Sequence, residues 1–157
     1  MKLLVLNGPN LNLLGTREPN IYGQESYAYL CMLIEEVCAE EGVEVEIYQS
    51  NHEGALVDRI QDAYGVVDGI VINPAAYTHT SVALLDAVKA VGIPTVEVHI
   101  SDPDTREPFR RLSYIRAACI ATVKGKGLAG YGEAIRLLLS HLRSEREAQN
   151  AEETEEN

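Results

Sequence analysis

Short apolar segments alternate with amphipathic helical patterns along most of this chain. The strand-like segments fall at 2–7, 43–49, 66–73, 95–100 and 117–123. The helical patterns between and after them fall at 27–40, 53–64, 81–91 and 131–143. Strands joined by helical crossovers pair in parallel, because each crossover returns the chain to the same end of the sheet. The alternation predicts an α/β fold, a flavodoxin-like five-stranded parallel sheet with helices on both faces.

Local signals mark where these helices begin and end. Ser26 is suited to cap the first helix, and Thr80 or Ser81 the third. Gly42 and the segment 92–94, Gly-Ile-Pro, are typical of helix ends.

The chain is long enough for one domain with a real core, since 46% of its 157 residues are hydrophobic. We expect a single catalytic domain over residues 1–144. Residues 147–157 include no basic and no large apolar side chain. The segment 145–157 is therefore predicted to be a disordered acidic tail.

Charge and cysteine content exclude several classes of protein. A net charge of -11 argues against nucleic acid and anionic membranes as partners. No apolar run could span a membrane, and the N-terminal residues do not resemble a signal peptide. The three cysteines lack metal-site spacing and are interpreted as small core residues. These features predict a cytoplasmic protein.

Polar residues follow three of the predicted strands. They lie in the segments 7–10, 73–79 and 97–101. Ligands of parallel α/β sheets bind beyond the carboxyl ends of the strands. The three segments therefore predict a ligand site at this edge of the sheet.

Glu97 and His99 stand two residues apart in a predicted strand, so their side chains leave the same face. A carboxylate there can orient the imidazole and stabilise its protonated form, although a solvated strand end has the same pattern. Asn10 and Asn73 each lie beside a proline, which fits either turn chemistry or contacts with a ligand.

Other polar residues near this edge each allow two interpretations. His79 precedes a helix and is either a surface or capping residue or part of the site. The group Arg106, Arg110 and Arg111 is either solvated or recognises carboxylates and hydroxyls. Asp86 lies on a helix face, and within one chain we interpret it as solvated.

The segment 11–23 is unusually long for a loop between a strand and a helix. It holds Arg17 and Tyr22, five residues apart. A tyrosine is no base at neutral pH unless something stabilises its phenolate, and a guanidinium does so. The alternative is that Tyr22 anchors the loop by packing while Arg17 is solvated.

Several catalytic mechanisms have no support in the sequence. It lacks a Gly-x-Gly-x-x-Gly or Walker-type phosphate loop, a Gly-x-Ser-x-Gly elbow, and a dense His/Asp cluster for a metal. Lys2, Lys89, Lys124 and Lys126 lie away from the convergent edge, so a Schiff base is not expected.

Several blocks of sequence resemble type II 3-dehydroquinate dehydratases. They are LNGPNLNLLG at 6–15, REP at 17–19, IYG at 21–23, QSNHEG at 49–54, NP at 73–74, YTHTS at 77–81, EVHIS at 97–101, RE at 106–107, FR at 109–110, GL at 127–128 and GY at 130–131. These blocks occur in the expected order and cover about residues 1–139. The acidic tail falls outside them.

The resemblance implies a lyase that reversibly dehydrates 3-dehydroquinate to 3-dehydroshikimate, by anti elimination through an enolate. The substrate that it implies is a small molecule, and the reaction needs neither a metal nor an organic cofactor. The resemblance also implies a role in the shikimate pathway of aromatic amino acid biosynthesis or in quinate breakdown. It also implies a homododecamer built as a tetramer of trimers.

The resemblance assigns roles to the catalytic residues. Tyr22 is the base, and Arg17 keeps it ionised and closes with it on a mobile lid. Asn10 helps to hold a water at the enolate oxygen. His99 protonates the departing hydroxyl and is oriented by Glu97.

The resemblance also assigns the residues that bind substrate. Asn73 and the backbone N–H groups of Ile100 and Ser101 bind the carboxylate end. His79 and Arg110 contact ring hydroxyls. Asp86 reaches the site of a neighbouring subunit, which would replace its interpretation as solvated.

The chain departs from the family at Asp102, usually Asn, and at Asp104, more often His or Tyr. Two added carboxylates beside an anion site are expected to weaken substrate binding or shift Arg110. Two alternatives remain: a non-catalytic flavodoxin-like protein that binds a flavin or a phosphorylated ligand, and a lyase of a related cyclic hydroxy-ketone acid.

Overall fold

The computed structural model describes residues 1–16, 18, 20 and 25–156. Within them, five parallel strands form one sheet in the order β2-β1-β3-β4-β5. The strands are β1 (Lys2–Asn7), β2 (Glu44–Gln49), β3 (Gly69–Asn73), β4 (Thr95–His99) and β5 (Ala121–Lys124). This strand order confirms the predicted flavodoxin-like sheet.

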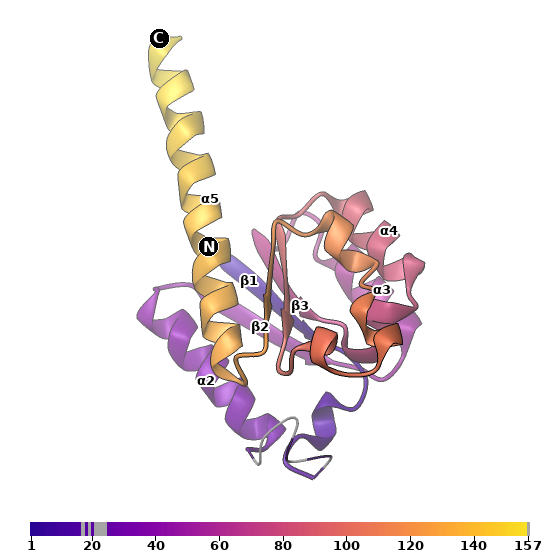
Figure 1. The fold of residues 1–157 in the computed structure, drawn as a ribbon. Helices are drawn as coiled ribbons and strands as arrows, with labels where there is room; N and C mark the ends of the chain where they lie inside the picture. The colour runs from indigo at the N-terminus through magenta and orange to yellow at the C-terminus, as the bar shows by residue number, and fades with distance from the viewer. Residues whose placement is uncertain (17, 19, 21–24, 157) are drawn as a thin grey trace.

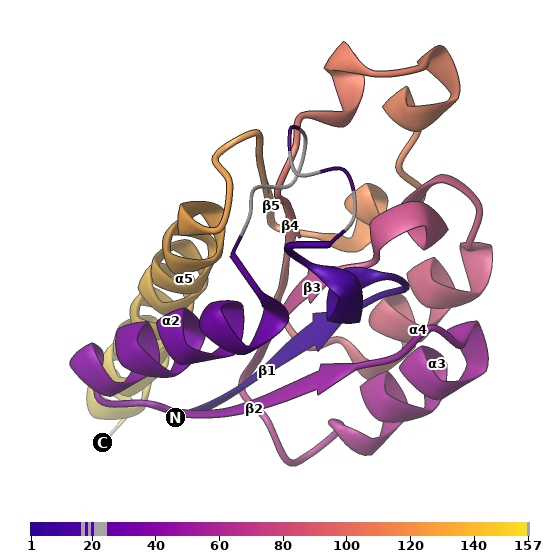
Figure 2. The same cartoon turned by 90° about the horizontal axis from the view of Figure 1, so that it is seen from below.

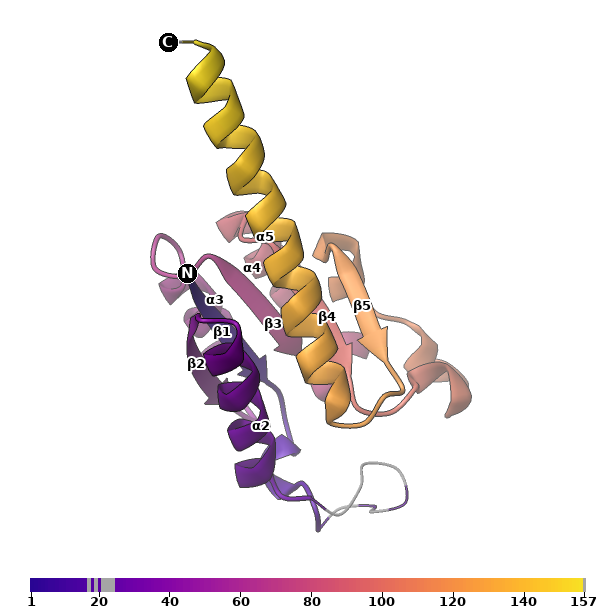
Figure 3. The ribbon, with the colours of Figure 1, turned by 90° about the vertical axis from the view of Figure 1, so that its left-hand side faces the viewer.

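Helices cover both faces of the sheet, as predicted (Figure 2). Helices α2 (Tyr27–Glu40) and α5 (Ala129–Glu155) pack on one face, and α3 (Glu53–Asp62) and α4 (Val82–Val91) on the other. α5 lies across β3, β4 and β5 (Figure 3).

The central strand β1 shows why its sequence is continuously apolar. Leu3 and Val5 face α2 and α5, while Leu4 and Leu6 face α3 and α4. All four side chains are fully buried. Burying one such side chain contributes about 1.5–3 kcal/mol before entropy is counted. A strand covered on both faces therefore needs apolar residues at every position.

The predicted helix caps are present. Ser26 Oγ accepts a hydrogen bond from the Tyr29 N–H at 3.1 Å, and Ser81 Oγ accepts one from Leu84 N–H at 3.0 Å. Gly92 ends α4 with a φ of 65°, which favours glycine. The helix caps follow from local chemistry that the sequence displays.

β3 and β5 start several residues later than predicted because backbone turns compete for their first residues. The N–H groups of Val66 and Val67 both bond to the carbonyl of Ala63, so β3 begins at Gly69. A 3₁₀ turn, η5 (Ile115–Ala118), occupies the residues before β5. Two further turns, η3 (Pro103–Thr105) and η4 (Pro108–Arg111), shape the preceding loop.

The final helix is longer than predicted. The disordered tail expected at 145–157 is helical as far as Glu155 and projects away from the sheet (Figure 1). Its last buried side chain is Leu142. Beyond it, Ala, Glu, Gln and Arg favour helix by intrinsic propensity. Arg143 and Arg146 also pair with Glu41 and Asp68 of the body, each at 3.0 Å.

All three cysteines of the sequence are free thiols. Cys38 is buried, as predicted, whereas Cys31 and Cys119 are only partly buried. In the part of the chain that the structure describes, no helix is long and apolar enough to cross a membrane.

Candidate active site

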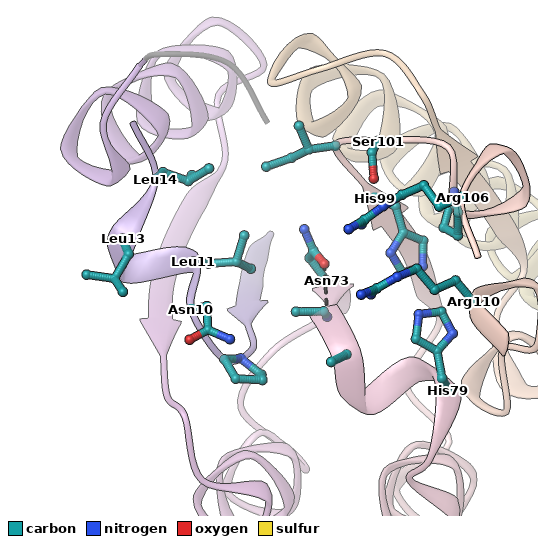
Figure 4. Close-up of a pocket in the computed structure, with 15 residues that line it drawn as sticks. Asn10, Leu11, Leu13, Leu14, Asn73, His79, His99, Ser101, Arg106 and Arg110 are labelled. Atoms are coloured by element: carbon teal, nitrogen blue, oxygen red, sulfur yellow. Dashed lines mark hydrogen bonds between the residues drawn. The ribbon is translucent and has the colours of Figure 1, made fainter. Parts of the chain in front are cut away.

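A pocket lies beyond the carboxyl ends of β1, β3 and β4, where the sequence predicted a ligand site (Figure 4). Each strand is followed by a segment that forms part of its wall. The polar residues of the wall are Asn10 after β1, Asn73 and His79 at the end of and after β3, and His99, Ser101, Arg106 and Arg110 at the end of and after β4. Ile100 also lines it, and Leu11, Leu13 and Leu14 make an apolar side.

The pocket depends on a close approach between the segments that follow β1 and β3. The Gly8 N–H donates to the carbonyl of Asn73 at 2.8 Å. A Cβ at position 8 would lie 2.4 Å from the carbonyl oxygen of Pro74. Only glycine allows this approach. Asn10 follows in the left-handed region, with a φ of 69°, and its N–H donates to Asn51 Oδ1 at 3.0 Å.

Asn73 is held by a buried network of polar side chains. Its Oδ1 accepts from the Ala75 N–H at 3.1 Å, and its Nδ2 donates to Tyr131 Oη at 2.9 Å. Tyr131 in turn donates to Asn7 Oδ1 at 2.7 Å, and Asn7 Nδ2 donates to Tyr27 Oη at 3.4 Å. The amide orientation of Asn73 is thereby fixed, and its second N–H can serve a ligand.

Tyr131 supports the site, a role that the sequence did not assign to it although it lies in the GY block at 130–131. Its apolar neighbours in α5 favour a core position, and its hydroxyl partners lie 58 and 124 positions away. Burial raises the pKa of Tyr131 far above its ordinary value. The phenol therefore stays protonated and keeps donating to Asn7.

Replacing Tyr131 with phenylalanine is expected to lower the free energy of unfolding by about 1–3 kcal/mol, because the buried amides of Asn7 and Asn73 each lose a partner. Chemical denaturation would measure the loss. Tyr64→Phe is the matched control, since Tyr64 is 70% exposed. Equal stability of the two variants would contradict the role of this network.

Glu97 and His99 form the pair that their spacing predicted. Glu97 is fully buried at the centre of β4, and His99 is nearly so at its end. His99 Nε2 lies in hydrogen-bond contact with Glu97 Oε2. The carboxylate therefore orients the imidazole that lines the pocket.

Glu97 has further donors that the sequence did not reveal. Arg116 reaches both oxygens, from Nε to Oε1 at 3.1 Å and from Nη2 to Oε2 at 3.3 Å. Ser113 Oγ donates to Oε2 at 2.9 Å. Burial alone would raise the pKa of Glu97, but hydrogen bonds and charges from His99 and Arg116 lower it to about 2. Glu97 is thus an anion at neutral pH, able to stabilise a protonated His99.

His79 joins the pocket to the loop that follows β4. Its Nδ1 lies 2.7 Å from the carbonyl oxygen of Leu112, which can only accept, so Nδ1 carries the proton. Burial lowers the pKa of His79, and the nearby positive charges of His99 and Arg110 act in the same direction. The ring is therefore neutral at neutral pH, and its Nε2 is an acceptor.

The arginine group divides between the pocket and the surface. Arg106 and Arg110 line the pocket and point toward Asn73 (Figure 4), whereas Arg111 is exposed. Arg110 Nε donates to Glu107 Oε2 at 2.6 Å, and its guanidinium lies 5.1 Å from the centre of the Phe109 ring. Two cations therefore face a small pocket, which suits an anionic ligand.

Lys124 balances the charge of Asp102 and Asp104, the two carboxylates at which the chain departs from the family. Neither Asp102 nor Asp104 lines the pocket. Lys124 bonds to Asp104 and lies 3.7 Å from Asp102 Oδ1. The hydrogen bond from Lys124 lowers the pKa of Asp104. The expected displacement of Arg110 has no basis here, because Arg110 pairs with Glu107 instead.

Three predicted site residues, Asp86, Arg17 and Tyr22, are not among the described residues that line this pocket. Asp86 is exposed on α4 and is not part of the pocket wall. Arg17 and Tyr22 lie outside the described residues. Within the described ranges, no three His, Cys, Asp or Glu side chains gather closely enough to hold a metal ion.

Comparisons with known proteins agree with one another. Residues 1–139 match the family model for class II dehydroquinase. A 3-dehydroquinate dehydratase of Clostridium acetobutylicum is 52% identical over 142 residues, which cover 90% of this chain and 99% of that relative. A catabolic 3-dehydroquinase of Verticillium alfalfae is 51% identical over 142 residues, covering 90% and 95%.

A solved structure has the same fold. The type II dehydroquinase of Butyrivibrio crossotus superimposes with a TM-score of 0.87 at 55% identity, covering 88% of this chain and 97% of that one. The chain therefore belongs to the class II dehydroquinase family, and its strand order agrees with this assignment.

Proposed function

We propose that this protein dehydrates 3-dehydroquinate to 3-dehydroshikimate, as its family membership indicates. The observation that carries the proposal is the pocket itself. It presents His99, backed by the anionic Glu97, beside Asn73 and two arginines. The same reaction serves aromatic biosynthesis and quinate breakdown, and one relative is named a catabolic 3-dehydroquinase.

The reaction removes a proton beside a ketone and a hydroxyl from the next carbon, so it needs one base and one acid. We assign the base to Tyr22, with Arg17 stabilising its phenolate. His99 is the acid that protonates the departing hydroxyl, which leaves as water. Asn10 holds a water that stabilises the enolate oxygen.

Substrate binding follows from the charge of the ligand. We assign the substrate carboxylate to the free N–H of Asn73 and the backbone N–H groups of Ile100 and Ser101. The neutral His79 accepts from a ring hydroxyl through Nε2, and Arg110 donates to another. The fixed amide of Asn73 supports this assignment, because it presents a donor without a rearrangement cost.

The assembly is part of the proposal. Residues 1–144 form the catalytic domain of a cytoplasmic homododecamer, arranged as a tetramer of trimers, in which Asp86 contributes to a neighbouring site. The exposure of Asp86, away from the pocket of its own chain, supports a contact with a second chain. The free cysteines fit a reducing compartment.

The test is ultraviolet absorbance of the purified protein mixed with 3-dehydroquinate. The product contains a conjugated enone, so absorbance rises as the reaction proceeds. No rise from a folded, assembled sample would contradict the proposal. A panel of related cyclic hydroxy-ketone acids would then test the alternative lyase, and a bound chromophore would favour a flavin carrier.

Lys124→Gln is expected to raise KM for 3-dehydroquinate about two- to tenfold with little change in kcat. The substitution removes the cation closest to Asp102 and Asp104, two carboxylates near a site for an anion. Lys126→Gln is the control, because Lys126 pairs with Glu133 at 2.6 Å instead. Equal KM values for the two variants would mean that Lys124 does not shield the pocket.

A further inference from the structure

Arg116 holds the buried carboxylate of Glu97 and has no role in the chemistry proposed for the pocket. The residue belongs to η5, 19 positions after Glu97. Its Nε and Nη2 each reach a different oxygen of that carboxylate. Such a two-pronged contact fixes the plane of a carboxylate as well as its charge. The Oε2 atom that faces His99 is therefore placed by Arg116.

One oxygen of this carboxylate contacts two basic side chains. Oε2 contacts both the His99 ring and Arg116 Nη2. A positive charge on Arg116 offsets part of the negative charge that would otherwise stabilise a protonated imidazole. Because Glu97 is fully buried, bulk solvent screens this competition only weakly. Arg116 itself has a side chain that is 37% exposed, so solvent moderates its effect.

We propose that Arg116 is a positioning residue that fixes the carboxylate plane of Glu97 and shares the charge of that carboxylate with His99. The proposal rests on the assignment of His99 as the proton donor of the dehydration. Without Arg116, the whole charge of Glu97 would act on the imidazolium, which would hold its proton more tightly. A tighter hold slows transfer to the departing hydroxyl.

Other groups around the pair do not supply this balance. Ser113 and Thr78 donate to Glu97 but are uncharged. The charged or titratable groups that face the pair from neighbouring elements are His79 in the 3₁₀ turn η2 (Ala75–His79), Arg110 in η4, Cys119 after η5 and Lys124 in β5. His79 is neutral, burial raises the pKa of Cys119 to about 12, and Arg110 and Lys124 pair with other carboxylates. Arg116 is thus the cation that bonds directly to Glu97 besides His99, within the described residues.

The test is to titrate His99 in the assembled full-length protein by NMR of ¹³C-labelled histidine. His99→Asn identifies its signal among the four histidines of the chain. In Arg116→Gln the titration midpoint of His99 is expected to rise by about one pH unit. Arg116→Lys keeps the charge and is expected to restore most of the wild-type value. Arg116→Met removes the charge with a side chain of similar length, as a second variant.

Arg111→Gln is the matched control, because Arg111 is exposed in the same loop and is not a partner of Glu97. An unchanged midpoint in both Arg116→Gln and Arg116→Met, or an equal rise in Arg111→Gln, would overturn the proposal. The alkaline limb of kcat/KM should move with the midpoint. The NMR measurement needs no turnover, so a shifted midpoint in a protein without dehydratase activity would refute the proposed function alone.

Discussion

Tyr22→Phe is expected to abolish turnover of 3-dehydroquinate while leaving its affinity nearly unchanged. Phenylalanine keeps the ring but lacks the oxygen that takes the proton, so the variant loses the base and little else. Loss of a general base alone costs about 10²–10⁴ in rate. The absorbance assay measures turnover, and calorimetry with the inactive variant measures binding of unconverted substrate.

Tyr27 and Tyr131, the two tyrosines of the network behind Asn73, cannot replace Tyr22. Burial raises the pKa of Tyr27 to about 12, and burial also raises the pKa of Tyr131. Both phenols therefore stay protonated at neutral pH. Tyr64→Phe is a suitable control, since this side chain lies on the surface. Near-normal turnover in Tyr22→Phe would show that another group takes the proton.

Features encoded by neighbouring residues could be predicted from the sequence. The spacing of Glu97 and His99 placed both on one face of a strand, and the structure brings them into contact. The serines at positions 26 and 81 cap their helices as expected. The edge of the sheet where the polar segments meet followed from strand polarity alone.

Features created by the packing of distant segments could not be predicted. Arg116 lies near the predicted start of a strand, where nothing local indicates a partner 19 positions earlier. Tyr131 looks like a core residue of α5 until the fold brings it to Asn7 and Asn73. The contacts that support the site are therefore mainly tertiary.

The C-terminal helix shows where composition misled. Low hydrophobicity and excess acid indicate disorder because such a segment cannot bury apolar surface. Residues 143–155 are indeed exposed, yet they continue a helix already nucleated by the buried part of α5. Extending an existing helix avoids the cost of nucleation, so the intrinsic helix propensity of the added residues determines whether they stay helical. The prediction of a disordered tail rested on burial alone and did not take into account that helix α5 is already nucleated.

His99→Ala is expected to reduce kcat by about 10²–10⁴-fold with a much smaller change in KM, the usual effect of removing a general acid. The fold should survive, because Arg116 and Ser113 still donate to the buried Glu97. His141→Ala is the control, since His141 pairs with Glu145 on α5 at 3.0 Å. A loss below about tenfold would contradict the role of His99.

Proton exchange separates the roles of Tyr22 and His99. If Tyr22 forms the enolate and His99 acts only on the departing hydroxyl, His99→Ala should still exchange the substrate proton beside the ketone with deuterated water. Tyr22→Phe should not exchange this proton, because the variant cannot form the enolate. Exchange lost in both variants would mean that His99 also acts in enolate formation. Exchange retained in Tyr22→Phe would assign the base to a different residue.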